Sequence, residues 1–236
     1  MQATTEQPGP RDIEIPVDGR GRALQGSMLP PRRGAGMVVF AHGSGSSRFS
    51  RRNRYVASRL QARGLGTLLM DLLTEREEAE DAVTARLRFD IPMLASRVVA
   101  TLDWLGRQPA TSSCRLGLFG SSTGAAAALI AAAERPEAVA TVVSRGGRPD
   151  LAGETLPRVD CPVLLIVGER DDTVLELNES AAARLAGPSE LRIVAGATHL
   201  FEEPGALEEV AGLAADWFAE RLDAEPAATR NAGRSA

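Results

Sequence analysis

The chain has 236 residues, of which 44% are hydrophobic and 25% are charged, and its formal net charge is −4. This length allows one substantial domain with a buried core, and the mildly acidic balance disfavours nucleic acid, which binds strongly basic surfaces. All 27 basic residues are arginine, which excludes P-loop lysines, Schiff-base lysines and lysine general bases.

The termini and the cysteines point to a cytoplasmic protein. The N-terminal residues lack the charged and apolar regions of a signal peptide, and no stretch approaches about 18 uninterrupted apolar residues. Cys114 and Cys161 each precede an apolar run without metal-ligand spacing. We therefore expect no disulfide framework, no metal, no cofactor and no membrane partner, and the oligomeric state stays open.

The hydrophobic pattern alternates strands with helices along the chain. In order, it predicts a hairpin or meander over 12–17 and 23–29, a strand at 36–41, a helix at 51–63, a strand at 65–73, an acidic solvated helix or loop at 75–81 and a helix at 90–107. The second half predicts a strand at 114–119, a helix at 124–134, a strand at 139–143, a loop at 144–150, a strand at 161–168, a helix at 175–185, a strand at 191–194 and an amphipathic helix at 207–222.

This alternation predicts an α/β fold with a doubly wound, mostly parallel sheet and helices on both faces. We expect a single domain over 12–222, flanked by disordered polar tails at 1–11 and 223–236. The interval 147–161 between two strands is too short for a helical cap domain. The predicted site is therefore open and shallow.

The motif Gly120-Ser121-Ser122-Thr123-Gly124 joins an apolar run to an alanine-rich segment. Gly-x-Ser-x-Gly between a strand and a helix is the pattern of a nucleophile elbow, with Ser122 at the tip of the turn. The small residues allow strand and helix to cross closely, and the backbone N–H of Thr123 is placed to stabilise an oxyanion. Taken alone, the motif is more often a simple glycine-rich turn between a strand and a helix.

A serine nucleophile needs a histidine base, and the chain has two histidines. His199 follows the last predicted strand, at the sheet edge where the elbow also lies. His42 also follows a strand, and Gly43-Ser44-Gly45 behind it suits a loop that turns backbone N–H groups toward a ligand. We take His199 as the base, and His42 and Gly43 as substrate-binding candidates.

The acid that orients the histidine is expected after the strand at 161–168. Glu169, Asp171 and Asp172 are the candidates, and Asp171 is favoured because its distance from Gly168 lets the loop return over the sheet edge. Asp172 is the better candidate for capping the following helix. The resulting order of Ser122, Asp171 and His199 is that of α/β-hydrolases.

The chain resembles the α/β-hydrolases, and more narrowly the small cap-less enzymes grouped with the dienelactone hydrolase family. The resemblance covers nearly the whole chain and rests on His42-Gly43-Ser44-Gly45-Ser46, Gly120–Gly124, Gly168-Glu169-Arg170-Asp171 and Ala197-Thr198-His199. It implies Ser122 as nucleophile, Asp171 as acid, His199 as base, and the backbone N–H groups of Thr123 and Ser44 as oxyanion donors. True dienelactone hydrolases are similar in fold but carry cysteine at the elbow, so Ser122 favours a serine esterase over a lactone hydrolase.

Arginines occur at two further places near the predicted site. Arg145 either binds a substrate carboxylate or phosphate, or clamps its loop through a salt bridge. The cluster of Arg48, Arg51, Arg52 and Arg54 either forms an anion-attracting rim or, as we favour, a solvated helix face.

The sequence therefore predicts hydrolysis of a carboxylic ester of a small-molecule acyl substrate through a Ser-His-Asp triad. Thioester hydrolysis or acyl transfer by the same triad is an alternative. A non-catalytic hydrolase-fold receptor is another, and convergence of the three side chains discriminates against it. A nucleotide-binding module is a weaker possibility, because Gly43-Ser44-Gly45 lacks a third glycine.

Overall fold

A computed structural model describes residues 9–18 and 21–222 of the chain. The strands are β1 (Arg11–Pro16), β2 (Ala23–Leu29), β3 (Met37–Ala41), β4 (Gly66–Met70), β5 (Leu116–Ser121), β6 (Val139–Arg145), β7 (Val163–Gly168) and β8 (Ser189–Val194). The α-helices are α1 (Arg51–Ala62), α2 (Glu75–Thr84), α3 (Ile91–Leu105), α4 (Thr123–Glu134), α5 (Asp172–Ala182) and α6 (Ala206–Leu222). Two 3₁₀ segments, η1 (Leu87–Phe89) and η2 (Pro149–Arg158), lie between them.

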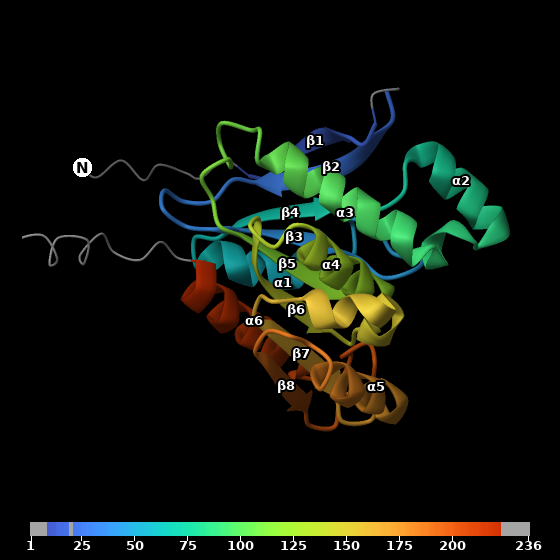
Figure 1. Ribbon diagram of the computed structural model, residues 1–236. Helices are drawn as coiled ribbons and strands as arrows, with labels where there is room; N and C mark the ends of the chain where they lie inside the picture. Colours follow the sequence, from blue (N-terminus) through green and yellow to red (C-terminus); the bar gives the residue numbers. More distant parts are fainter. Residues whose placement is uncertain (1–8, 19–20, 223–236) are drawn as a thin grey trace, which may run out of the picture.

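The strands form one eight-stranded sheet in the order β1-β2-β4-β3-β5-β6-β7-β8 (Figure 1). From β4 to β8 neighbouring strands are parallel, whereas β1–β2 and β2–β4 pair antiparallel. The central strands β3, β4, β5 and β7 are buried at every residue, as expected for parallel strands covered on both faces. The predicted fold class is confirmed.

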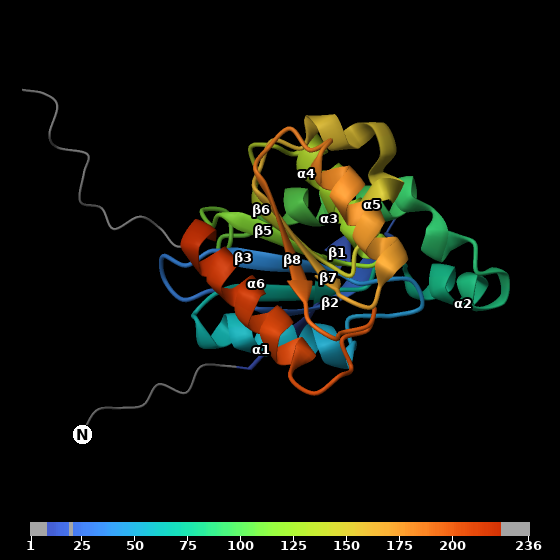
Figure 2. The ribbon, with the colours of Figure 1, turned by 90° about the horizontal axis from the view of Figure 1, so that it is seen from below.

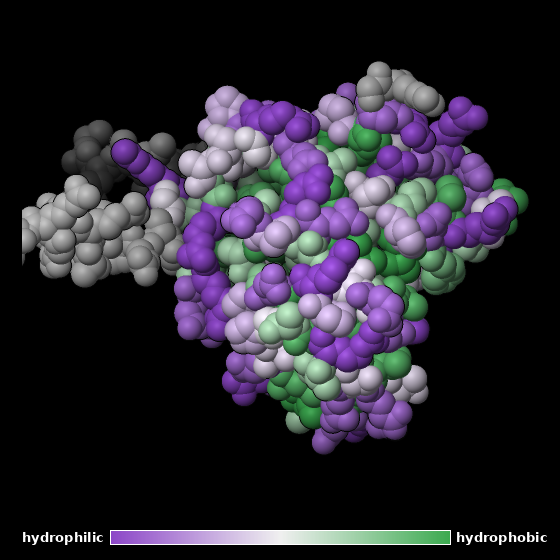
Figure 3. Space-filling view, viewed as in Figure 1, coloured by the Kyte–Doolittle hydropathy of each residue, from purple (hydrophilic) through white to green (hydrophobic). Residues whose placement is uncertain are grey.

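Helices cover both faces of the sheet. Figure 2 shows α1 and α6 on one side of the strands and α3, α4 and α5 on the other. The core is divided accordingly: one buried cluster includes Leu118 and several alanines of α4, and the other includes Phe119, Val143 and Phe218. Polar and apolar side chains are interspersed on the face seen in Figure 3.

Local signals in the sequence explain where several helices begin. Thr74 and Glu77 form a reciprocal capping box at the start of α2, so the acidic run at 75–81 is helical. Asp90 accepts a hydrogen bond from the backbone of Met93 and thereby caps α3. Within the described ranges, no helix is long and apolar enough to cross a membrane.

Several predicted boundaries were wrong. β1 begins at Arg11, which was assigned to the N-terminal tail. Ser144 and Arg145 belong to β6 and not to the loop after it. The interval between β6 and β7 forms η2, which sequence reasoning missed, and no cap domain is inserted there. The predicted tails fall largely at 1–8 and 223–236, outside the described residues, and the limits of the domain at 12 and 222 remain a prediction.

Candidate active site

Ser122 occupies the sharp turn between β5 and α4. Its φ of 50° and ψ of −123° are unusual for a non-glycine residue and store conformational strain at this turn. The two flanking glycines permit the turn. A Cβ on Gly120 would lie 2.4 Å from the Cα of Ala125, and one on Gly124 would lie 2.3 Å from the carbonyl oxygen of Ala41. The sequence motif therefore has the backbone geometry of a nucleophile elbow.

This close packing predicts a strong effect of Gly124→Ala. The added methyl group would meet the backbone of β3, which cannot move aside like a flexible side chain. We expect the free energy of unfolding to fall by about 3 kcal/mol or more. Gly212→Ala is the matched control, because a Cβ there has no neighbour within 4 Å, and alanine in α6 should stabilise by about 0.5–1 kcal/mol. Urea unfolding of both variants checks this, and equal midpoints would contradict it.

Asp171 and His199 come together from the ends of β7 and β8. Asp171 Oδ2 lies 2.6 Å from His199 Nδ1, and the Asp171 and His199 side chains are 15% and 38% exposed. Asp171 is the N-cap residue of α5 but makes no side-chain capping bond, and Asp172 is the first residue of the helix. The assignment of Asp172 as the cap was therefore wrong, since the carboxylate at the cap position binds the histidine.

The backbone around Gly146 connects this pair with the elbow. The N–H of Ser122 donates to the carbonyl oxygen of Arg145 at 3.3 Å. A Cβ on Gly146 would lie 3.5 Å from Cε1 of His199. Ser122 and the His199 ring therefore both adjoin the residues at 145–146. Within the described residues, no hydrogen bond joins the Ser122 hydroxyl to the ring, and such bonds often tighten only when substrate is bound.

The loop after β3 packs against the elbow. A Cβ on Gly43 would lie 3.0 Å from Cβ of Ser122. The N–H of Ser44, expected to be an oxyanion donor, donates to Oγ1 of Thr123 at 2.9 Å. The N–H of Thr123 is in the first turn of α4, where backbone N–H groups have no partner within the helix. The N–H of Ser44 would have to give up its hydrogen bond to Thr123 Oγ1 before it could donate to an oxyanion.

His42 is buried and has both ring nitrogens engaged. The N–H of Leu72 donates to Nε2 at 3.2 Å, so Nδ1 carries the proton and donates to the carbonyl oxygen of Gly43 at 2.8 Å. This arrangement leaves the ring no further polar atom for a substrate. His42 therefore positions the loop that begins at Gly43.

Burial lowers the pKa of His42 below its ordinary 6.5, which predicts a pH dependence of stability. Below about pH 6.5 the unfolded chain gains a proton that the native ring resists, so the free energy of unfolding falls as pH falls toward the native pKa. His42→Gln should lose less stability than the wild type between about pH 7.5 and about pH 5.5. Urea unfolding at the two pH values measures this, and equal losses would contradict it.

The arginines near the site differ in their partners. Arg48 pairs with Asp71, and Arg52 Nη1 lies 2.9 Å from Glu202 Oε1. Arg51 and Arg54 are exposed on α1, as expected for a solvated helix face, and Arg54 lies over the ring of Phe49. Arg148 binds Asp150 at 2.7 Å. Arg145 makes no ion pair within the described part of the chain. One of the two roles predicted for it, a salt bridge that clamps its loop, is therefore not found there.

Sequence reasoning missed two supporting residues. Asn178 of α5 is fully buried, and its Nδ2 donates to the carbonyl oxygens of Gly147 at 3.0 Å and Val174 at 2.7 Å. Asp71 accepts a hydrogen bond from the backbone N–H of Arg48 at 2.7 Å and holds the loop after β3. Both residues had a signal in the sequence that could have indicated a supporting role. Asn178 is a polar residue inside a helix, and Asp71 is an acid directly after a buried strand.

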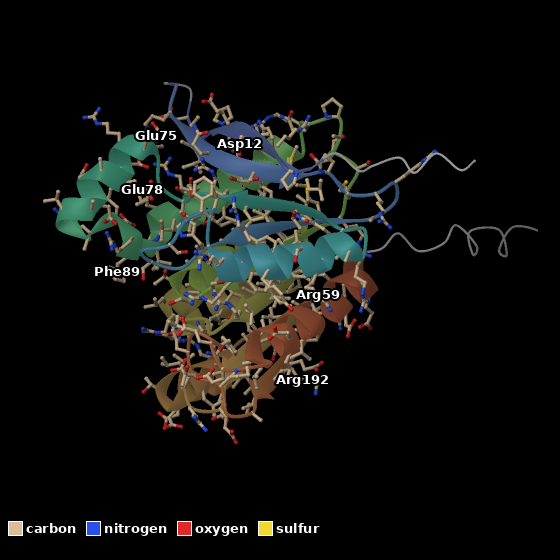
Figure 4. The ribbon with its side chains drawn as sticks, turned by 180° about the vertical axis from the view of Figure 1, so that it is seen from behind. Asp12, Arg59, Glu75, Glu78, Phe89 and Arg192 are labelled. Carbon is tan, nitrogen blue, oxygen red and sulfur yellow. The ribbon has the colours of Figure 1, made fainter. Side chains whose placement is uncertain are left out.

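A cavity of about 500 Å³ opens beside the loop after β3, whose Gly43 packs against Ser122. The loop after β3 forms one wall, and the segment that follows β4, together with α2 and α3, forms the others; Gly43, Ser44, Phe49, Leu72, Ala82 and Leu94 are among its lining residues. Figure 4 shows Glu78, another lining residue, on α2. Its mixture of leucine, serine and acidic side chains suits a small, partly polar molecule.

Comparisons with known proteins show the family and the fold of the chain. The sequence model of the dienelactone hydrolase family matches residues 25–224. A crystal structure of a dienelactone hydrolase from Anabaena variabilis has a TM-score of 0.89 and 53% identity, with coverage of 92% of this chain and 100% of the other. Est1E from Butyrivibrio proteoclasticus has a TM-score of 0.73 at 15% identity, with coverage of 91% of this chain and 99% of the other, and shows the fold alone.

A curated relative from Mycobacterium tuberculosis strain H37Rv, named "Putative phosphoribosyl transferase", is 55% identical over 212 residues. The match covers 90% of this chain but 47% of the relative, so the chain spans about half the length of that protein. The match to the family model covers residues 25–224, which is most of the chain. The chain belongs to the dienelactone hydrolase family and has the α/β-hydrolase fold.

Proposed function

We propose that the chain is a serine hydrolase that cleaves carboxylic esters of small molecules through Ser122, His199 and Asp171. The observation that supports this most strongly is the 2.6 Å hydrogen bond between Asp171 and His199. It orients the ring at the same sheet edge where Ser122 is held in a strained elbow. A histidine fixed in this way by a carboxylate is the base that a serine nucleophile requires.

In the proposed reaction, His199 Nε2 accepts the proton of the Ser122 hydroxyl as its oxygen attacks the ester carbonyl. The carbonyl oxygen becomes an oxyanion that the N–H of Thr123 stabilises, with the N–H of Ser44 as a second donor once it leaves Thr123 Oγ1. His199 then gives the proton to the departing alcohol, which leaves an acyl group on Ser122. Water, activated by His199, hydrolyses the acyl-enzyme and restores the serine.

The proposal assigns this activity to the stretch that the chain shares with its longer mycobacterial relative. The name of that relative describes a protein about twice as long as the shared stretch. The dienelactone hydrolase from Anabaena variabilis, in contrast, is covered completely. Hydrolysis is therefore the activity that we attribute to this chain.

The test combines labelling with a substrate panel. We expect a fluorophosphonate probe to modify Ser122, as located by peptide mass spectrometry, and the protein to hydrolyse short p-nitrophenyl esters. Acyl-CoA thioesters form a second arm, and faster turnover of these would favour thioester hydrolysis by the same triad. No hydrolysis in either arm, together with an unlabelled Ser122, would overturn the proposal.

A further inference from the structure

Arg145 is a buried cation that no acidic side chain of the described residues pairs with. The residue is 7% exposed, and within the described residues its guanidinium makes no ion pair or hydrogen bond. The Nε atom is sealed from solvent, whereas the terminal nitrogens are not among the sealed atoms. The guanidinium carbon lies 5.8 Å from the ring centroid of Phe201. Burial, with a smaller contribution from the charge of Arg52, lowers the pKa of Arg145 to about 10.

The other buried charged side chains of the described chain are all paired. Arg97 Nη2 lies 2.6 Å from Glu77 Oε1, Asp81 binds Arg88 at 2.6 Å, and Asp71 binds Arg48. This contrast matters because a buried charge without a counter-charge is strongly unfavourable. The fold therefore keeps a cation at position 145 that its own side chains do not neutralise.

Arg145 adjoins the proposed site through its backbone and its neighbours. Its carbonyl oxygen accepts a hydrogen bond from the Ser122 N–H, and a Cβ on the next residue, Gly146, would lie 3.5 Å from Cε1 of His199. Alternation along β6 puts Arg145 on the same face as Val143, which packs in one cluster with Phe201. Phe201 is the second residue after His199, so the guanidinium lies against the loop that carries the base.

The charges around the guanidinium leave a net positive site. Arg52 is the nearby cation, and its partner Glu202 is 66% exposed. Arg145, Arg52 and Glu202 together carry one positive charge. A ligand with one negative charge would neutralise this group, and the planar guanidinium suits two parallel hydrogen bonds to a carboxylate or a phosphate.

We propose that Arg145 forms an anion-binding subsite that selects esters with a negatively charged group, either carboxylate or phosphate, on the acyl or alcohol part. The selection of substrates rests on the proposed ester hydrolysis, whereas anion binding by Arg145 does not depend on it. Arg52 supports the subsite by adding positive charge beside it. In this assignment Arg145 is a specificity-determining residue and takes no part in proton transfer.

The kinetic test compares two esters of equal chain length, p-nitrophenyl butyrate and mono-p-nitrophenyl succinate. We expect the wild type to favour the anionic ester in kcat/KM, and Arg145→Met to reduce that preference about tenfold or more, since a charge-assisted hydrogen bond is lost. Arg59→Gln is the matched control, because Arg59 lies exposed on α1 (Figure 4). An unchanged preference in Arg145→Met would overturn the subsite.

Urea unfolding separates a binding role from a structural one. Replacing an unpaired buried cation by an apolar side chain of similar length should leave the unfolding midpoint unchanged or raise it. A markedly lower midpoint for Arg145→Met would show that the guanidinium supports the fold and would contradict the proposal.

Direct binding separates the subsite from the proposed hydrolysis and distinguishes its ligands. Succinate and inorganic phosphate are titrated by calorimetry into the wild type, Arg145→Met and Arg59→Gln. We expect the wild type and Arg59→Gln to bind at least one anion and Arg145→Met to lose it, and the anion that binds identifies the group. If no ester is hydrolysed but this pattern appears, the subsite stands and the proposed function fails. Equal binding, or no binding, in the wild type and Arg145→Met overturns the subsite.

Discussion

Ser122→Ala is expected to lower kcat for ester hydrolysis by about 10⁴-fold or more. The substitution removes the oxygen that attacks the carbonyl, and the members of a triad act as a unit, so the remaining groups cannot compensate. The variant should fold, because alanine retains the Cβ and the backbone bonds of Ser122 to Arg145 and Arg148. Initial rates with p-nitrophenyl butyrate measure the effect.

The neighbouring serine supplies the control for this prediction. Ser121 is buried, and its hydroxyl donates to Oδ1 of Asn53 at 3.2 Å, on the face covered by α1. Ser121→Ala should therefore keep the fluorophosphonate label at position 122 and most of the activity. If Ser122→Ala retained wild-type rates, or if the label moved to Ser121, the assignment of the nucleophile would be wrong.

Asp171→Asn is expected to lower kcat by about 10⁴-fold, as in other triads where the acid is made an amide. The asparagine can donate a hydrogen bond to Nδ1 of His199, which stabilises the tautomer with the proton on Nε2 and removes the base. Because Asp171 makes no side-chain capping bond, the start of α5 should change little. Rates and unfolding midpoints of the variant test both parts.

Asp172→Asn is the matched control one residue along the chain. Asp172 is exposed in the first turn of α5, where an acidic side chain interacts favourably with the helix dipole. Its loss should cost about 0.5 kcal/mol of stability and leave kcat near the wild-type value. Equal kinetic losses in the two variants would overturn the choice of Asp171 as the acid.

The sheet was predictable because parallel strands buried on both faces are continuous apolar runs, and β3, β5 and β7 are of this kind. The end of β6 could not be predicted in this way, because Ser144 and Arg145 are polar. Their backbones nevertheless continue the ladder, with Ser144 paired to Gly120 and to Leu165. Hydrogen bonds to two neighbouring strands, which a sequence pattern does not contain, extend the strand.

The order of strands and helices along the chain was enough to predict that the candidate site residues lie at strand ends. It was not enough to predict the hydrogen bonds that these residues make. Asp171 and Asp172 are adjacent acids, and the direction in which the chain leaves β7 decides which one meets His199. Likewise, the donation by the Ser44 N–H to Thr123 joins residues 79 positions apart. Such contacts depend on the packing of the two loops and leave no local signal.

The positive φ of Ser122 also bears on how the chain tolerates substitution. Of the three non-glycine residues with positive φ in the described ranges, Ser122 and Phe201 flank the proposed site, and Ala85 ends α2. Each such residue costs about 1–3 kcal/mol, against a total stability of about 5–15 kcal/mol for a typical domain. The sheet edge that carries the serine and the histidine is therefore held in place by the packing of the remaining core. Core substitutions remote from Ser122 are expected to disturb this edge before they unfold the chain.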